Sequence, residues 1–294
     1  MIKKVIKSSQ YTDHITGIEF IFVKGGCYQM GDTFDDGNDD EKPVHEVCVD
    51  DFYIGKYPVT LGEFRKFVND TGYRTEAEEG GGSYYWNGSE YKKDVKINWQ
   101  NPGFRQDEEH PGVCVSWNDC QKYINWLKQK PGFRQDKKYP VVCVSWNDCQ
   151  EYINWLKQKS GLNYCLLTEA EWEYAARTGG KNEKYSGGNN VDDVAWYNKN
   201  SDGYTHKVGT KLPNGLGIYD MSGNVWEWVQ DWYDSDYYKN NHKDNPQGPS
   251  SGSLRALRGG SWYNDPEGTR CVRRGSHAPE YRRRLCGFRL KRTP

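Results

Sequence analysis

Two short motifs that contain glycine lie near the C-terminus, and the segment between them limits what this chain can fold into. The first motif is RGGSW at 258–262 and the second is GFRL at 287–290. Paired glycines suit a place where two backbones pass closely, because glycine has no Cβ to clash. In the second motif Phe288 and Leu290 alternate with Arg289, which predicts a terminal strand with one buried face. The segment between fits neither a helical nor a strand period, and such long irregular segments commonly present binding or catalytic surfaces.

Composition favours a folded protein whose core depends on large aromatic rings. The 294 residues include 12 Trp and 22 Tyr, whereas disordered chains contain few aromatic residues. The net charge of -1 gives no overall attraction to nucleic acid or to a membrane surface. No uninterrupted apolar run reaches transmembrane length, and no apolar stretch follows the basic start at 1–7. We therefore expect no transmembrane segment in this chain, with a trimmed leader as an open alternative.

Cysteine usage leaves the redox compartment open. The chain has nine cysteines, an odd number, and four of them lie in a duplicated segment. None forms a Cys-x-x-Cys pair, and no cluster of cysteine and histidine has the spacing of a zinc site. We expect mostly buried free thiols, with one or two disulfides as the alternative.

Short strands and loops are predicted in the N-terminal third. Apolar residues predict strands at 19–23, 25–31 and 44–49. The acidic segment at 35–41 lacks the spacing of a calcium-binding EF-hand, so we expect a solvated loop there. The glycines and tyrosines at 76–91 also predict a loop.

Two predicted helices begin with capping boxes. Thr60 is followed three residues later by Glu63, and Thr168 is followed in the same way by Glu171. The second helix, at 167–177, is expected to end at the glycines of 179–180. Its predicted buried stripe consists of Trp172, Ala175 and Ala176.

The middle of the chain contains an internal repeat. Residues 102–130 recur as 131–159, a period of about 29 residues. Each copy predicts a short strand, an N-cap at Ser116 or Ser145, and a helix. Two copies are too few for a solenoid, which needs about three or more stacked units. We interpret the repeat as a tandem duplication, one copy of which the fold accommodates at its surface.

Several motifs together resemble the formylglycine-generating-enzyme-like (sulfatase-modifying factor) domain, an irregular variant of the C-type lectin fold. The matching stretches, in family order, lie at 25–31, 41–45, 57–60, 168–177, 214–228, 258–262 and 287–289. The resemblance implies an α+β fold with few helices, short strands and much loop. It implies one domain at 17–294, after a peripheral segment at 1–16, with a variable region at 258–290. Cys165 and Leu167 depart from the Arg and Pro that the family usually has there.

The resemblance also implies where catalytic members hold copper, with which they oxidise a substrate cysteine. Two cysteines, three and eight residues after the serine of the RGGS motif, bind that ion. Asn264 and Thr269 occupy those positions here, and neither supplies the soft thiolate that Cu(I) selects. The related iron-dependent sulfoxide synthases use clustered histidines, whereas the six histidines here are scattered. We therefore expect a protein that is not an enzyme and requires no cofactor. The alternative is a metal-dependent oxidoreductase of the formylglycine-generating or sulfoxide-synthase type with rearranged ligands, using Cys271 or Cys286.

A structural calcium site is a further implication of the resemblance. In the family, the loop that matches 220–227 binds calcium through two side chains and two carbonyls. Here these would be the side chains of Asp220 and Glu227 and the backbone oxygens of Gly223 and Val225. All four are hard oxygen donors, as calcium requires. A loop held by hydrogen bonds alone, with Glu227 capping backbone amides, is the alternative.

The C-terminal layout is also similar to the variable proteins of diversity-generating retroelements, in which adenine-directed mutagenesis rewrites codons near the end of the gene. We therefore predict a non-catalytic, receptor-type protein whose C-terminal, hypervariable surface binds a ligand through adaptable polar groups and aromatic rings. The predicted ligand contacts are Trp262, Tyr263, Asn264, Asp265, Gly268, Thr269, Arg274, Gly275, Ser276, His277, Ala278, Tyr281, Arg283, Arg284, Leu285 and Cys286. An ordinary solvated loop without a ligand is the alternative.

We expect a protein or cell-surface ligand, and no nucleic-acid partner. The Arg and Lys residues at 270–292 suit anionic or carboxylate-bearing partners, although Arg273, Arg282 and Arg289 match framework positions of the family. The expected state is a monomer at the bacterial cell surface or in the periplasm, with the cytoplasm as the alternative.

Overall fold

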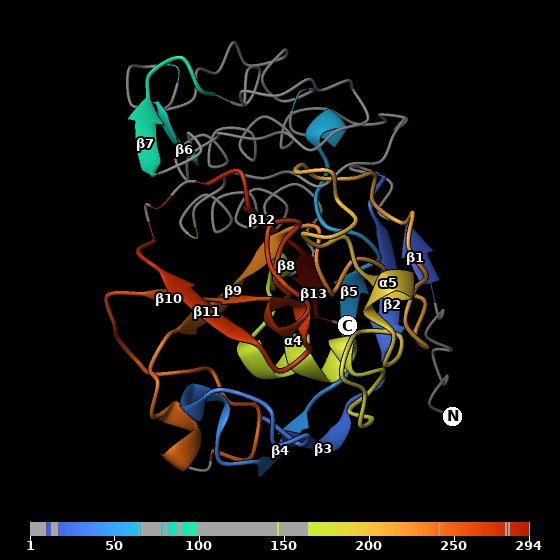
Figure 1. Cartoon of the computed structure of the whole chain (residues 1–294). Helices are drawn as coiled ribbons and strands as arrows, with labels where there is room; N and C mark the ends of the chain where they lie inside the picture. Colours follow the sequence, from blue (N-terminus) through green and yellow to red (C-terminus); the bar gives the residue numbers. More distant parts are fainter. Residues whose placement is uncertain are drawn as a thin grey trace.

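The computed structural model describes residues 10–12, 17–63, 65, 78, 82–86, 90–98, 146, 164–240, 242–279, 281 and 283–293 (Figure 1). The predicted duplication at 102–159 lies outside these residues, apart from Trp146. Within the described part, strands predominate and helices are few, as the sequence predicts. No helix in that part is both long enough and apolar enough to cross a membrane.

A five-stranded antiparallel sheet joins the two ends of the chain. Its order is β1 (Gln10–Thr12), β2 (Glu19–Val23), β5 (Phe52–Gly55), β13 (Leu290–Arg292) and β8 (Tyr164–Leu166). The edge strand β1 lies in the segment expected to be peripheral. β13 lies between β5 and β8, so hydrogen bonds on both sides hold the last strand of the chain (Figure 1).

A four-stranded sheet contains most of the C-terminal region. Its order is β11 (Arg274–His277), β10 (Arg255–Arg258), β9 (Trp226–Trp232) and β12 (Cys286–Phe288). β10 is antiparallel to both of its neighbours, whereas β12 is parallel to β9. The prediction of an irregular segment between the two glycine motifs is therefore wrong at 274–277. This segment has no alternation of apolar residues that would predict a strand. It is a strand because it pairs with β10.

Two ribbons complete the described sheets. β3 (Gly26–Met30) pairs with β4 (His45–Val49), which confirms two predicted strands. β6 (Ser83–Trp86) pairs with β7 (Tyr91–Asp94), so the prediction of a loop at 76–91 is wrong at 83–86 and at Tyr91. The short 3-10 helices are η1 (Asp39–Glu41), η3 (Tyr237–Asn240) and η4 (Glu267–Thr269).

Both predicted capping boxes are present. Glu171 Oε2 accepts a hydrogen bond from the Thr168 amide at 2.9 Å, and Thr168 Oγ1 accepts one from the Glu171 amide at 3.2 Å. This box begins α4 (Glu169–Ala176), which two glycines with φ of +77° and +83° at 179 and 180 end, as predicted. At the other box, Glu63 Oε2 accepts from the Thr60 amide at 2.7 Å. A one-turn helix, α5 (Val191–Val194), follows later.

Every residue of α4 is buried, so the prediction of a single buried stripe is too narrow. Buried arginines explain how its glutamates are accommodated. Glu169 accepts from Arg258 at 2.9 Å and from Arg274 at 2.8 Å, and Glu173 accepts from Arg258 at 2.6 Å. Buried carboxylates need such partners, because an unpaired buried charge is strongly destabilising.

The acidic segment at 35–41 is not wholly solvated, which corrects the prediction at Glu41. This side chain is buried and accepts hydrogen bonds from Arg270 at 2.7 and 3.1 Å. The pair connects η1 to the end of η4, which are far apart in sequence.

Two hydrophobic clusters lie against the four-stranded sheet. Trp228 and Leu257 belong to one cluster, and their chain neighbours Val229 and Ala256 belong to the other. Successive residues of a strand point to opposite faces, so β9 and β10 are covered on both faces. The first cluster includes Phe288 and Leu290 at the end of the chain, and the second includes most of α4.

One pair of cysteines forms a disulfide, whereas the sequence predicts mostly buried free thiols, with disulfides as the alternative. Cys27 and Cys48 lie opposite each other in β3 and β4 and form a disulfide. Cys165, Cys271 and Cys286 form no disulfide within the described residues, and the last two are buried. The remaining four cysteines lie in the duplicated segment, outside the described residues.

Candidate ligand-binding site

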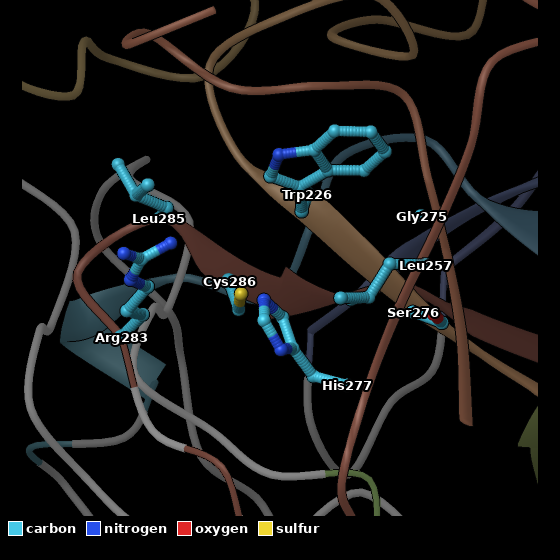
Figure 2. Close-up of a pocket in the computed structure, with 8 residues that line it drawn as sticks. All are labelled: Trp226, Leu257, Gly275, Ser276, His277, Arg283, Leu285 and Cys286. Atoms are coloured by element: carbon cyan, nitrogen blue, oxygen red, sulfur yellow. The ribbon is translucent and has the colours of Figure 1, made fainter. Parts of the chain in front are cut away.

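A cavity of about 190 Å³ opens on the four-stranded sheet (Figure 2). Each of the four strands of that sheet contributes at least one residue to the lining of the cavity. The lining residues are Trp226, Leu257, Gly275, Ser276, His277, Arg283, Leu285 and Cys286. Six of these eight were predicted ligand contacts, so the fold brings part of the predicted set together around one space.

The strand register places the cavity walls. β11 runs antiparallel to β10 with Gly275 opposite Leu257, and β12 runs parallel to β9 with Cys286 opposite Trp226. A Cβ atom at Gly275 would lie 3.1 Å from the Trp226 ring. Glycine at this position therefore allows the indole to pack against the β11 backbone.

His277 is an aromatic and uncharged part of the wall. Its ring stacks on Tyr281 with centroids 3.8 Å apart and an interplanar angle of 22°. Burial lowers the pKa of His277 to about 4, and the nearby charge of Arg283 contributes in the same direction. The imidazole is therefore neutral near pH 7. The Tyr281 ring also stacks with the ring of Tyr84 in β6, and the centroids of these two rings are 6.1 Å apart.

Arg283 brings a positive charge to the cavity, and Cys286 brings a thiol. In the view of Figure 2, the Cys286 sulfur lies between the side chains of Arg283 and His277, with Trp226 across from them. Burial raises the pKa of Cys286 to about 12, although Arg283 opposes this effect. The thiol is therefore protonated near pH 7.

Cys271 and Cys286 lie in different hydrophobic clusters. The Cys271 carbonyl accepts a hydrogen bond from Arg258 at 2.7 Å, and burial raises the pKa of its thiol well above the ordinary value. This placement does not make the two thiols one site.

The two positions that hold copper in the family carry hydrogen-bonded oxygens here. Asn264 Oδ1 accepts from the Ser261 amide at 3.0 Å and from its hydroxyl at 2.8 Å. Thr269 is fully buried, and its hydroxyl donates to the Pro266 carbonyl at 2.9 Å. An amide and a hydroxyl that complete local turns do not fit a Cu(I) ion, which prefers thiolates.

The other predicted contacts separate into exposed and buried residues. Tyr263 and Asp265 are exposed, and Ala278 and Arg284 are half-buried. Trp262 is buried and donates from Nε1 to the Arg284 carbonyl at 3.1 Å. The prediction of a surface contact is wrong for four residues, which are buried inside the fold: Trp262, Gly268, Thr269 and Arg274. Arg274 is the clearest case, since both ends of its guanidinium bind Glu169.

Two wall residues, Trp226 and Leu257, are absent from the predicted set. Both lie in strands that precede the irregular segment, on β9 and β10. The tryptophans at 226, 228 and 232 indicate a buried strand, but no local signal shows which strand pairs with it. Their place in the cavity follows from the parallel pairing of β12 with β9.

Both acidic side chains predicted to bind calcium have hydrogen-bond partners within the protein. Both Glu227 oxygens accept hydrogen bonds from Arg289, and Oε2 also accepts from Trp172 Nε1 at 2.7 Å. Asp220 Oδ2 accepts from the Gly209 amide at 2.7 Å, and burial raises the pKa of Asp220 to about 6. The Glu227 carboxylate is already neutralised by a guanidinium and also accepts from an indole, so it does not fit a calcium ligand set.

Fold and site together define a protein of the formylglycine-generating-enzyme-like class. The chain belongs to the family of the sulfatase-modifying factor enzyme 1-like domain, whose sequence model matches residues 7–131 and 127–294. This match confirms the resemblance inferred from the motifs.

Curated relatives and solved structures support the same assignment. The chain is 32% identical to the formylglycine-generating enzyme of Bos taurus, over 91% of this chain and 72% of that protein. It is 31% identical to the inactive C-alpha-formylglycine-generating enzyme 2 of Bos taurus, over 92% and 87%. Among structures, PvdO from Pseudomonas aeruginosa aligns with a TM-score of 0.71 at 28% identity, covering 97% and 98%. Treponema denticola variable protein 1 aligns with a TM-score of 0.68 at 25% identity, covering 98% and 100%.

These relatives overturn the prediction that the protein is not an enzyme. Proteins about one third identical over most of the chain are named formylglycine-generating enzymes in mammals and in Streptomyces coelicolor. The prediction relied on the two copper positions and on the scattered histidines, whereas the similarity extends over nearly the whole chain.

Proposed function

We propose that this protein is a receptor-type ligand-binding protein in which residues 258–290 of a C-type-lectin-like frame form the contact surface. The observation that carries the proposal is the cavity, because six of its eight lining residues lie between Gly275 and Cys286. Four of the six, Gly275, Ser276, His277 and Cys286, lie in β11 and β12, so paired strands fix the geometry of that part of the wall. The buried arginines that stabilise the frame are not among the lining residues, so ligand contact and folding use separate side chains.

The cavity favours a ligand group with a small apolar or aromatic body and an anionic end. Its volume of about 190 Å³ exceeds the roughly 150 Å³ of a cavity known to hold benzene. Trp226, Leu257 and Leu285 supply apolar surface, and Arg283 supplies a positive charge. Because His277 is neutral near pH 7, Arg283 is the cationic side chain of the lining.

Benzoate and benzyl alcohol are suitable probes, because they share a ring and differ in charge. We expect ligand-observed NMR titrations to give tighter binding of benzoate. Arg283→Gln should weaken benzoate binding about tenfold or more, which corresponds to the loss of a charge-assisted hydrogen bond, and should leave benzyl alcohol unchanged. Ser276→Trp fills the cavity and should abolish binding of both probes.

Lys239→Gln is the matched control, because it removes an exposed positive charge outside the cavity. It should leave both titrations unchanged. Equal benzoate affinity in the wild type, Arg283→Gln and Ser276→Trp would show that the cavity is not the binding site.

We also propose that the exposed part of this surface is hypervariable and displayed at the cell surface, with one protein or cell-surface ligand per variant. Similarity to a variable protein over 98% of this chain supports this proposal, and Tyr263 and Asp265 offer exposed side chains within 258–290. An adenine-rich near-copy of the coding segment for 258–290, next to a reverse transcriptase gene, would support it. A genome with neither would leave a binding surface of fixed sequence.

Family membership favours a second candidate function, oxidation of a substrate cysteine as the names of the relatives indicate. The Cys286 thiol on the cavity wall is the specific feature in its favour. Incubation with Cu(I), oxygen and a cysteine-containing peptide, followed by mass spectrometry of the peptide, tests it. Conversion of the peptide cysteine that is lost in Cys286→Ser would favour this function over binding alone.

A further inference from the structure

The outer face of the β3–β4 ribbon carries two sulfur atoms and a carboxylate close together. The two strands alternate strictly: Tyr28, Met30, Val47 and Val49 are buried, whereas Cys27 and Glu46 are exposed and Cys48 is half-buried. Cys27 is directly opposite Cys48, with 3.9 Å between their Cα atoms. Glu46 lies two residues before Cys48 and therefore on the same face. The two sulfurs and one Glu46 oxygen all lie within 4.8 Å of one another.

We propose that Cys27, Cys48 and Glu46 form a redox-controlled binding site for a thiophilic divalent cation such as Zn²⁺, which becomes available when the Cys27–Cys48 disulfide is reduced. Two thiolates and one carboxylate are ligands that Zn²⁺ accepts, with a fourth position left for water. The site lies on a different sheet from the cavity and does not depend on the proposed ligand-binding function.

The ribbon holds these groups in place by means other than the disulfide. Five residue pairs, from Gly26 opposite Val49 to Met30 opposite His45, form the ladder. A crossing segment fixes Cys48 from outside, because its amide donates to the Lys243 carbonyl at 2.8 Å and its carbonyl accepts from the Asn245 amide at 2.8 Å. The buried face packs in a hydrophobic cluster with α4. Reduction therefore frees two sulfurs on a backbone that keeps its place.

Glu46 already binds a cation on this face. Lys243 Nζ lies 2.9 Å from Glu46 Oε2, and both side chains are about half exposed. Such an exposed pair is weak, so a divalent ion bound by two thiolates can displace the ammonium. Lys243 therefore competes with the metal and lowers its affinity.

The redox step balances with an external dithiol as reductant. The dithiol transfers two electrons and two protons to the Cys27–Cys48 bond, which breaks to give two thiols, while the dithiol becomes a cyclic disulfide. Binding of Zn²⁺ then releases the two thiol protons, because the thiolate is the metal ligand. Exchange with an added disulfide reverses the step: the Cys27–Cys48 bond forms, the added disulfide takes up the two electrons and becomes two thiolates, and the ion is released.

The test measures Zn²⁺ bound by the full chain before and after reduction with a dithiol that is then removed under anaerobic conditions. Competition with a chromogenic chelator gives stoichiometry and affinity, and Cd²⁺ gives a sulfur-to-metal charge-transfer band in the ultraviolet. We expect the reduced protein to bind one ion per chain more than the oxidised protein does. Because the other seven cysteines can also take up metal, the reduced Cys27→Ser/Cys48→Ser variant is the reference, and it should bind one ion fewer.

Two further variants keep both cysteines and the disulfide. Glu46→Gln should weaken the extra ion about tenfold or more, since it removes one ligand. Lys243→Ala should strengthen it about two- to fivefold, the amount expected from loss of a competing surface pair. Equal zinc uptake by the reduced wild type and the double serine variant would overturn the proposal, and so would unchanged affinity in Glu46→Gln.

Discussion

Arg289 and Glu227 form an ion pair from which solvent is excluded, with side chains 0% and 1% exposed. Arg289 Nη2 lies 2.7 Å from Glu227 Oε1, and Nε lies 3.0 Å from Oε2. The same guanidinium donates to the carbonyls of Gly55 and Tyr219. One residue therefore connects the end of the chain to β5, to β9 and to the loop before β9. Its burial agrees with the framework position that the family resemblance implies for Arg289.

Arg289→Leu should be among the most destabilising single substitutions in the described part of the chain. Loss of one partner leaves the Glu227 carboxylate buried without its counter-ion, which costs about 3–5 kcal/mol. Urea unfolding followed by tryptophan fluorescence measures the change. Arg289→Leu/Glu227→Leu should recover part of the loss, because no charge is then left unpaired. Lys239→Ala, at an exposed pair with Asp236, should leave the unfolding free energy unchanged within error. A loss in Arg289→Leu no larger than that in Lys239→Ala would contradict this reading of the pair.

Gly223 and Gly203 have similar backbone conformations but different surroundings, so alanine substitutions separate strain from crowding. Their φ angles are +76° and +83°. A Cβ at Gly223 would lie 2.2 Å from the Trp196 carbonyl oxygen, whereas nothing lies within 4 Å of a Cβ at Gly203. Gly203→Ala should cost about 1–2 kcal/mol from the left-handed conformation alone. Gly223→Ala should cost at least about 2 kcal/mol more, because backbone must move. Equal midpoints of thermal unfolding in the two variants would contradict the predicted close approach.

The burial of His277 predicts a pH dependence of stability. Its pKa is about 4 in the folded protein and 6.5 as an ordinary value, so the unfolded chain binds more protons between these two pH values. His277 therefore makes the free energy of unfolding rise with pH between about 4 and 6.5. Above pH 6.5 this increase is complete, because the imidazole is then neutral in both the folded and the unfolded chain. The difference in stability between the wild type and His277→Gln should increase from pH 4 to 6.5 and then remain constant. A difference that is independent of pH would show that His277 titrates normally. Urea titrations at several pH values measure it.

Much of the frame could be read from local sequence. The capping boxes at Thr60 and Thr168, the glycines that end α4, and the strands β2, β3 and β4 all depend on residues within a few positions of one another. Their hydrogen bonds form inside one element, so spacing alone predicts them. The family motifs then identified the fold class, because they occur in order along nearly the whole chain.

The cavity and the buried charges could not be read in this way. The sequence placed Gly275, His277 and Cys286 in one segment, but Trp226 and Leu257 join them only through the pairing of β12 with β9 and of β11 with β10. Likewise Arg274 and Arg289 have the charge of surface residues, and their carboxylate partners Glu169 and Glu227 lie 105 and 62 positions away.

The sequence by itself determined the class of fold and the ends of its local elements, since these depend on interactions between near neighbours. Only the tertiary structure decided which polar residues of the C-terminal region face the cavity and which are buried, because the strand register and distant ionic partners fix the exposure of each side chain.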